Sequence, residues 1–315
     1  MTLYNIFKFG VSLKILVTGA GGYIGAELIK ILNLDSIYMY RRRKVNSPNA
    51  IHTDDINYES NWFNYLDDVD CIIHLAGIAH NKVDDESEFQ RVNTEGTLRI
   101  AKYAARSKVK RLVFVSSIGV NGDHTKKSAF YPDSKPNPKN KFACSKYKAE
   151  KGLLELSSKT GLEVVLVRPT LVYGPNAPAN FGMLTNLIKR LPVLPFGLAT
   201  NRRDFISVQN LADLLVTCAT HPNAAGHTFL ASDGETVSIK EFTNAIAKGL
   251  GKKVFQLPVP VGLMRFAGKL TGKSAMIEQL YGNLEVDSSN IKEVLGWTPP
   301  FTMEQSMAFL KHTDK

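Results

Sequence analysis

The chain has 315 residues, of which 44% are hydrophobic and 22% are charged. These values are typical of a soluble globular protein with a substantial core, either one large α/β unit or two lobes. No apolar run approaches the roughly 20 residues that a membrane span needs, so we expect no membrane insertion. The 39 basic and 29 acidic residues give a net charge of +10, but the basic residues are spread along the chain, which favours small anionic ligands over nucleic acid.

The first residues and the cysteines bear on the compartment. Residues 1–11 contain apolar side chains but no small-residue cleavage site, so we interpret them as an N-terminal extension and not as a signal peptide. Cys71, Cys144 and Cys218 occur singly, as expected for thiols in a reducing compartment, and we therefore predict a cytoplasmic protein. The histidines are scattered and neither CxxC nor HExxH occurs, so we expect no metal site.

A glycine-rich turn follows the first predicted strand. The apolar run at Leu13–Val17 predicts a buried parallel strand, and Gly19, Gly22 and Gly25 lead into an apolar helix at Ala26–Leu32. In such a turn the first glycine permits a sharp bend, the second lets the backbone approach a pyrophosphate, and the third lets helix and strand pack closely. Because the positive helix end favours phosphate, the stretch predicts a dinucleotide-binding site.

The end of the second predicted strand bears on the choice of dinucleotide. The strand at Ile37–Tyr40 is followed directly by Arg41, Arg42, Arg43 and Lys44. NAD sites usually carry an acidic residue here, whereas a nearby arginine accommodates the 2′-phosphate of NADP. We therefore expect NADP, while NAD stays possible because the basic run can also be a solvated turn.

Strands and helices continue to alternate along the chain. Further strands are predicted at Ala50–Thr53, Cys71–Leu75, Arg111–Val115 and Val164–Val167, with long helices at Phe89–Arg106 and Lys141–Ser158. This alternation predicts an α/β fold with a Rossmann-like, doubly wound parallel sheet that binds ligands at the carboxyl ends of its strands. Asp55, after the third strand, either accepts a hydrogen bond from the adenine amino group or caps a short helix at about 62–66.

The composition changes beyond residue 170, where the alternation weakens and prolines become frequent. We predict an NAD(P)-binding domain at residues 12–170 and a smaller α+β lobe that binds the substrate at residues 171–315. Segments near 205–232 are expected to return to the main sheet.

An ordered series of motifs resembles the extended short-chain dehydrogenase/reductase family, specifically its nucleotide-sugar epimerases, reductases and dehydratases. The motifs are TGAGGYIG, HLAG at His74–Gly77, VNTEGT at Val92–Thr97, VSS at Val115–Ser117, FACSK at Phe142–Lys146, RPTLVYGP, RRDFISVQNLAD and LGWTPP. The resemblance covers about residues 13–305. It implies an NAD(P) domain and a C-terminal lobe that holds a nucleoside diphosphate sugar.

The resemblance also implies the catalytic positions. In this family a Ser or Thr, a Tyr and a Lys perform the chemistry, and the last two form Y-x-x-x-K on one helical face. The matching residues here are Ser117, Phe142 and Lys146. A literal Y-x-x-x-K occurs at Tyr147–Lys151, but five residues turn a side chain about 140° away from the direction of Phe142, so we interpret it as surface helix.

Phe142 cannot exchange a proton with a substrate. Loss of a positioned acid or base typically lowers the rate by roughly 10²- to 10⁴-fold, so we expect a chain that binds its ligands but turns over poorly. Three explanations are open: an engineered change of Tyr to Phe, a naturally inactive homologue, or an enzyme that uses another acid. We favour the first because the rest of the site is intact.

The residues after Ser117 bear on the reaction. Family dehydratases carry acidic residues there, whereas this chain has Ile118 and Gly119, which disfavours dehydration. We expect NAD(P)H-dependent 4-keto reduction of a UDP-6-deoxy-N-acetylhexosamine, favoured by the arginine cluster. The alternatives are a UDP-glucose or UDP-N-acetylglucosamine 4-epimerase with NAD, and an inactive protein that binds NAD(P) and a UDP-sugar.

The resemblance implies further contacts. For the cofactor they are the three glycines, the arginine run, Asp55, Lys146 and also Tyr23, Ile24, Ile56, Leu75, Ala76, Gly77, Asn93 and Pro169. For the substrate they are Ser117, Asn180, Leu194, Pro195 and Arg203. Arg203 would bind phosphate oxygen through a charge-assisted fork, although it can instead be a partner of Asp204. Family dimers pair the helices near 93–105 and 142–158, so we predict a homodimer.

Overall fold

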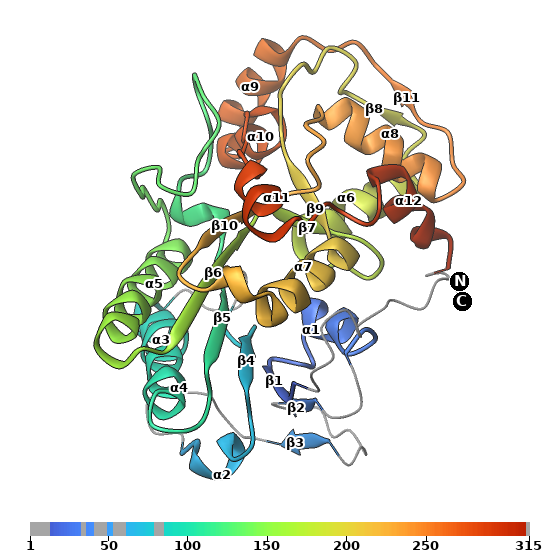
Figure 1. Cartoon of the computed structure of the whole chain (residues 1–315). Helices are drawn as coiled ribbons and strands as arrows, with labels where there is room; N and C mark the ends of the chain where they lie inside the picture. Colours follow the sequence, from blue (N-terminus) through green and yellow to red (C-terminus); the bar gives the residue numbers. More distant parts are fainter. Residues whose placement is uncertain (1–12, 33–35, 41–48, 53–60, 79–84, 313–315) are drawn as a thin grey trace.

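The computed structural model describes residues 13–32, 36–40, 49–52, 61–78 and 85–312. The predicted ligand residues Arg41, Arg42, Arg43, Asp55 and Ile56 lie outside these ranges. Figure 1 shows a central sheet with helices on both sides and, at the top of the view, a smaller group of elements from the C-terminal half of the chain.

Seven parallel strands form the central sheet, in the order β10-β6-β5-β4-β1-β2-β3. Their bounds are β1 (Ile15–Thr18), β2 (Ile37–Tyr40), β3 (Ala50–His52), β4 (Cys71–His74), β5 (Arg111–Val115), β6 (Glu163–Pro169) and β10 (Thr228–Ala231). The strand order reverses between β1 and β4, and open α/β sheets bind ligands at the carboxyl edge of such a point. The predicted Rossmann-like, doubly wound α/β fold is confirmed.

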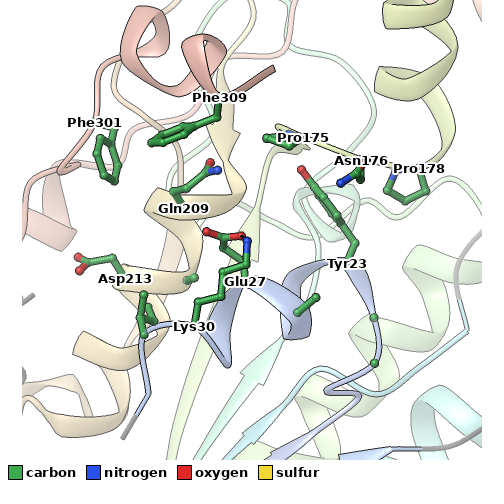
Figure 2. Close-up of a pocket in the computed structure, with 15 residues that line it drawn as sticks. Tyr23, Glu27, Lys30, Pro175, Asn176, Pro178, Gln209, Asp213, Phe301 and Phe309 are labelled. Carbon is green, nitrogen blue, oxygen red and sulfur yellow. Dashed lines mark hydrogen bonds and ion pairs between the residues drawn. The ribbon is translucent and has the colours of Figure 1, made fainter. Parts of the chain in front are cut away.

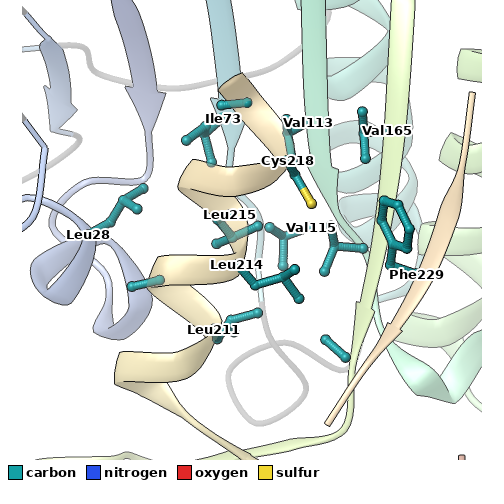
Figure 3. Packing of buried hydrophobic residues seen from close by; sticks show 14 of the residues in the cluster. Leu28, Ile73, Val113, Val115, Val165, Leu211, Leu214, Leu215, Cys218 and Phe229 are labelled. Carbon is teal, nitrogen blue, oxygen red and sulfur yellow. The ribbon is translucent and has the colours of Figure 1, made fainter. Parts of the chain in front are cut away.

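The side chains of the sheet alternate between two apolar cores, because successive residues of a strand point to opposite faces. Ile15 and Val17 pack in one core with α1 (Tyr23–Leu28), α7 (Val208–Thr220) and α11 (Ser289–Leu295). Figure 3 shows this core between α7 and the strands. Leu16 packs in the other core with α2 (Phe63–Leu66), α4 (Thr97–Ala104) and α5 (Lys141–Thr160). Both faces of the sheet are therefore covered, as its long apolar runs require.

The helix expected at Phe89–Arg106 is not a single α-helix. It consists of α3 (Glu86–Phe89), a π-helical segment (Gln90–Gly96) and α4. The π segment carries two side chains that bond to α5: Asn93 donates to Ser145 Oγ, and Thr94 donates to the Ser145 carbonyl oxygen. We attribute the π-helical segment, where an α-helix was expected, to these bonds with α5. Short π segments often occur at functional sites.

The remaining elements form a third apolar core. They comprise two strand pairs, β7 (Leu171–Tyr173) with β9 (Phe205–Ser207) and β8 (Val193–Leu194) with β11 (Phe255–Gln256), and the helices α6 (Ala179–Arg190), α8 (Ile239–Gly249), α9 (Val261–Leu270), α10 (Ser274–Tyr281) and α12 (Met303–Ala308). Short 3-10 turns lie at Ile118–Val120, Pro222–Ala224 and Phe309–His312. Of the stretch near 205–232, β10 pairs with the main sheet, whereas β9 pairs with β7 outside it.

Several apolar side chains on the two helices expected to pair in a dimer are buried within the single chain. Ile100, Ala101, Ala104 and Leu153 are fully buried, whereas Leu154 is 46% exposed. The homodimer therefore stays a prediction from the sequence.

Candidate active site

The glycine-rich turn packs against the end of β4. Gly19 has φ +75°, which glycine adopts readily, and a Cβ at this position would lie 2.8 Å from the Ala76 backbone nitrogen. A Cβ on Gly25 would lie 2.5 Å from the Gly19 carbonyl oxygen. Gly22 closes the turn by donating its N–H to the same oxygen at 2.9 Å. The spacing of the three glycines therefore builds the bend and the close helix contact that the sequence analysis expected of them.

A buried histidine joins this turn to the neighbouring strand. His74, at the end of β4, has Nδ1 2.7 Å from Thr18 Oγ1 and Nε2 3.0 Å from Thr97 Oγ1. Thr97 donates its own proton to the Asn93 carbonyl oxygen, so His74 Nε2 donates and Nδ1 accepts. Burial, assisted by the charge of Lys146, lowers the His74 pKa to about 3, which keeps the ring neutral. The network holds the ends of β1 and β4 in register.

Gly77, Asn93 and Lys146 meet just beyond the end of β4. A Cβ on Gly77 would lie 2.8 Å from Asn93 Oδ1 and 3.5 Å from Lys146 Nζ. The Asn93 side chain bonds to both backbone polar groups of Ile78 as well as to Ser145. These bonds make Asn93 a positioning residue, and its predicted cofactor contact stays a prediction.

Lys146 is the buried cation of the site. Its ammonium group donates to the Val115 carbonyl oxygen at 2.9 Å and lies 4.7 Å from the centre of the Phe114 ring. Burial lowers the Lys146 pKa to about 8, against the opposite influence of Glu150. The ammonium group is therefore held at the carboxyl end of β5, where a parallel sheet presents ligands.

Ser117 and Phe142 approach the same place from two elements. Ser117 Oγ accepts from the Gly119 N–H at 3.1 Å, and a Cβ on Gly119 would lie 3.3 Å from both Ser117 Oγ and Ala143 Cβ. Phe142, next to Ala143 in the first turn of α5, packs its ring 6.4 Å from that of Phe89. The three predicted catalytic positions therefore lie together at the ends of β5 and the start of α5.

The alternative Y-x-x-x-K pair lies elsewhere on α5. Lys151 is exposed, and its ammonium group lies 5.4 Å from the centre of the Tyr147 ring. Lys146, by contrast, is 5% exposed. Lys146 is therefore buried and Lys151 lies on the surface, as predicted from the different directions in which the two side chains leave the helix.

Arg168 and Glu150 hold α5 in place, and the sequence analysis did not single out either of them. Arg168 of β6 binds the Glu150 carboxylate through two nitrogens, at 2.9 and 2.6 Å, and donates to Asn121 Oδ1 at 2.9 Å. Glu150 lies one helical turn beyond Lys146. The i, i+4 spacing of Lys146 and Glu150 is the only sequence signal, and it does not identify Arg168 as the partner.

A second part of the site lies between α6 and α10. A cavity of about 350 Å³ is lined mainly by apolar side chains and by the predicted residues Asn180 and Arg203. Arg203 is 8% exposed, and it donates to the Gly282 carbonyl oxygen at 3.0 Å. Burial lowers its pKa to about 10, and the structure records no carboxylate paired with it in the described part of the chain. Asp204 instead accepts from Thr236 and Val286, so the alternative pairing of Arg203 with Asp204 is wrong.

Leu194 and Pro195, which were also predicted to contact the substrate, lie outside the cavity that Arg203 lines. Leu194 is buried in the third core, and the Pro195 carbonyl oxygen accepts from Tyr281 at 2.8 Å. Their contact with a substrate stays a prediction.

A larger cavity, of about 690 Å³, lies on the outer side of α1 (Figure 2). Gly22 and Tyr23 line it together with residues of α7 and the C-terminal segment, whereas Ser117 and Lys146 do not. Among the residues described, the Tyr23 hydroxyl has no hydrogen-bond partner, and burial raises its pKa. This cavity is separate from the place where the predicted catalytic positions meet.

Comparisons with known proteins identify the family of the chain. The model of the NAD dependent epimerase/dehydratase family matches residues 15–232. The chain belongs to this family.

Similar proteins cover almost the whole chain. A Vibrio cholerae protein named UDP-glucose 4-epimerase is 40% identical, over 96% of this chain and 97% of its own. The Escherichia coli O157:H7 N-acetyl-alpha-D-glucosaminyl-diphospho-ditrans,octacis-undecaprenol 4-epimerase is 24% identical over 93% of both chains. The structure of UDP-N-acetylglucosamine 4-epimerase from Bacillus cereus has a TM-score of 0.77 with 21% identity, over 95% of this chain and 98% of that chain.

The residues present fit a nicotinamide dinucleotide. The lack of a Cβ at Gly77 leaves room beside Lys146 and Asn93, and Gly19 and Gly22 keep the first turn free of side chains. No group of three or more His, Cys, Asp or Glu side chains within the described ranges is arranged to hold a metal ion. No helix within these ranges is both long and apolar enough to cross a membrane.

Proposed function

We propose that this chain is a sugar-nucleotide enzyme that acts at C4 of the sugar, and that its reaction is 4-epimerisation of a UDP-hexose with NAD. The observation that carries the proposal is the meeting of Ser117, Phe142 and Lys146 at the carboxyl end of β5, in a chain 40% identical to a named UDP-glucose 4-epimerase. The family's description as NAD dependent supports NAD over NADP.

Each residue of the site has a role in this proposal. Bound NAD supplies a nicotinamide that accepts a hydride from sugar C4 and returns it. Lys146 would hold the hydroxyls of the adjoining ribose, and Ser117 Oγ would bond the C4 oxygen. Phe142 offers no acidic hydrogen, so the C4 hydroxyl proton lacks the positioned base that a tyrosine at this place provides.

Arg203 would bind the diphosphate of the substrate. A buried guanidinium without a carboxylate partner is stabilised when an anion enters, and it matches phosphate oxygens with two parallel N–H groups. The two named relatives act on sugars joined to a diphosphate, one carried by uridine and the other by a lipid. We propose the uridine carrier because the relative with the higher identity uses it.

A second candidate is NADPH-dependent 4-keto reduction of a UDP-6-deoxy-N-acetylhexosamine. The observation that favours it is the run Arg41–Arg43 directly after β2, with no acidic residue at that place in the sequence. Replacing these arginines together with alanine should lower NADPH affinity at least tenfold if they bind the 2′-phosphate.

The experiment supplies the purified chain with NAD and UDP-glucose and, separately, with NADPH and a UDP-4-keto sugar. Formation of UDP-galactose, followed by NMR, supports the epimerase, whereas oxidation of NADPH supports the reductase. Calorimetry with NAD, NADPH and UDP accompanies both assays. Tight binding of the ligands without turnover, also after Phe142→Tyr, would favour a protein that only binds them.

A further inference from the structure

Exposed apolar side chains gather on one part of the molecule. Eleven of the fifteen large hydrophobic side chains that are exposed in the described ranges lie within residues 183–276. They belong to α6, β8, β11, α9 and α10 and the loops beside them, at the top of Figure 1, away from β2 and β3. Large exposed apolar patches on soluble proteins mark binding sites for protein or membrane, and the exposed apolar side chains of this lobe are candidates for such a site.

Helix α9 carries two apolar stripes. Val261, Met264 and Gly268 form the packed stripe, and a Cβ on Gly268 would lie 2.8 Å from Ile277 Cγ1 of α10. The second stripe, spaced i, i+3 and i+7, points to solvent: Leu263, Phe266 and Leu270 are 56%, 56% and 72% exposed. A helix that is apolar on its outer face as well as its inner face is typically covered on both sides.

Basic side chains lie next to the outer stripe on α9 and in the turn that follows it. Helices α9 and α10 and the turn between them, residues 261–281, contain three basic residues and one acidic residue, a net charge of +2. The acidic residue, Glu278, pairs with Arg265 at 2.8 Å. Lys269 and Lys273, at the end of α9 and just beyond it, are exposed. Leu and Phe side chains beside lysines are the pattern of helices that lie in the interface of an anionic bilayer.

We propose that Leu263, Phe266 and Leu270, with Lys269 and Lys273, form a surface that docks on membranes containing anionic phospholipids. The apolar side chains enter the boundary between headgroups and acyl chains, and the ammonium groups contact lipid phosphates. A second copy of the chain is a less suitable partner than an anionic membrane. Two-fold pairing would bring the positively charged surfaces of the two copies together, where they repel each other. This docking is independent of the catalytic proposal.

The docking surface adjoins the cavity that holds Arg203. Met276 of α10 is 47% exposed and lines that cavity, and α10 packs directly on α9. Docking through α9 therefore brings one wall of the cavity close to the membrane surface.

The test is co-sedimentation of the full chain with vesicles. One set is pure phosphatidylcholine, and the other contains equal parts of phosphatidylcholine and phosphatidylglycerol. We expect binding to the anionic set, and a loss of at least tenfold for the combined change Leu263→Ser, Phe266→Ser and Leu270→Ser. Lys269→Gln with Lys273→Gln should also weaken binding and reduce its dependence on salt.

The control variant is Phe63→Ser, which removes a ring that is 50% exposed on α2. It should bind vesicles like the unchanged chain, and the melting temperatures should show that all variants are folded. Failure of the unchanged chain to bind the anionic vesicles would overturn the proposal, as would full binding by the triple variant. Light scattering measures the oligomeric state of both proteins. If the unchanged chain is an oligomer that does not bind vesicles, and the triple variant is a monomer, the surface would instead bind a second copy.

Discussion

The ammonium group of Lys146 lies 6.0 Å from the centre of the Phe142 ring. The two residues are one turn apart on α5, and the same ammonium group bonds to the end of β5. The helix therefore presents a cation and an aromatic ring at one place, but the ring carries no hydroxyl group for the cation to activate.

Loss of Arg203 should weaken the binding of UDP selectively. Arg203→Met removes charge-assisted bonds worth about 1.5–3 kcal/mol each, so calorimetry should report a dissociation constant for UDP at least tenfold higher. NAD affinity should not change. Arg202→Met is the control, because Arg202 is exposed and pairs with Glu285. Equal effects of the two variants on UDP would contradict the role given to Arg203.

Removal of Glu150 should destabilise the fold strongly. Glu150→Ala leaves the Arg168 guanidinium buried without its carboxylate, which costs about 3–5 kcal/mol. Glu155→Ala breaks an exposed, solvent-screened pair with Lys159 on the same helix and should change the stability far less. Denaturant unfolding measures both changes. Similar losses for the two variants would show that the buried pair does not hold α5 against β6.

The predicted alternation of strands and helices is confirmed because it rests on local signals, namely apolar runs of strand length separated by glycine turns and amphipathic helices. The meeting of Phe142 with Lys146 also followed from sequence, since both lie on one helix. Arg168 could not be paired with Glu150 in the same way, because the bond joins β6 to α5 across the fold. Likewise, nothing in the sequence distinguishes which apolar stripe of α9 the rest of the chain covers.

Acid should destabilise the protein in part through His74. Its pKa is about 3 in the fold and near 6.5 in an unfolded chain, so the unfolded state binds more protons between these values. The contribution of His74 to stability is complete above pH 6.5 and is lost as pH falls toward 3. Well inside this window the loss should be about 1 kcal/mol for each pH unit.

Denaturant unfolding of His74→Asn and the unchanged chain across this window measures the effect. The variant should lose less stability per pH unit than the unchanged chain. Asp233, whose pKa burial raises to about 6, acts in the opposite direction in both proteins and cancels in the comparison. Identical slopes would mean that the ring of His74 takes up a proton inside the fold.

The role of Phe142 is tested by the rate at which the Phe142→Tyr variant interconverts UDP-glucose and UDP-galactose with NAD bound. Placing a phenol one turn from Lys146 should raise the rate by roughly 10²- to 10⁴-fold over the unchanged chain. Tyr147→Phe, added to the same variant, should leave the increased rate unchanged. A rate that does not rise, although NAD and UDP-glucose both bind, would contradict the assignment of Phe142 to the acid–base position.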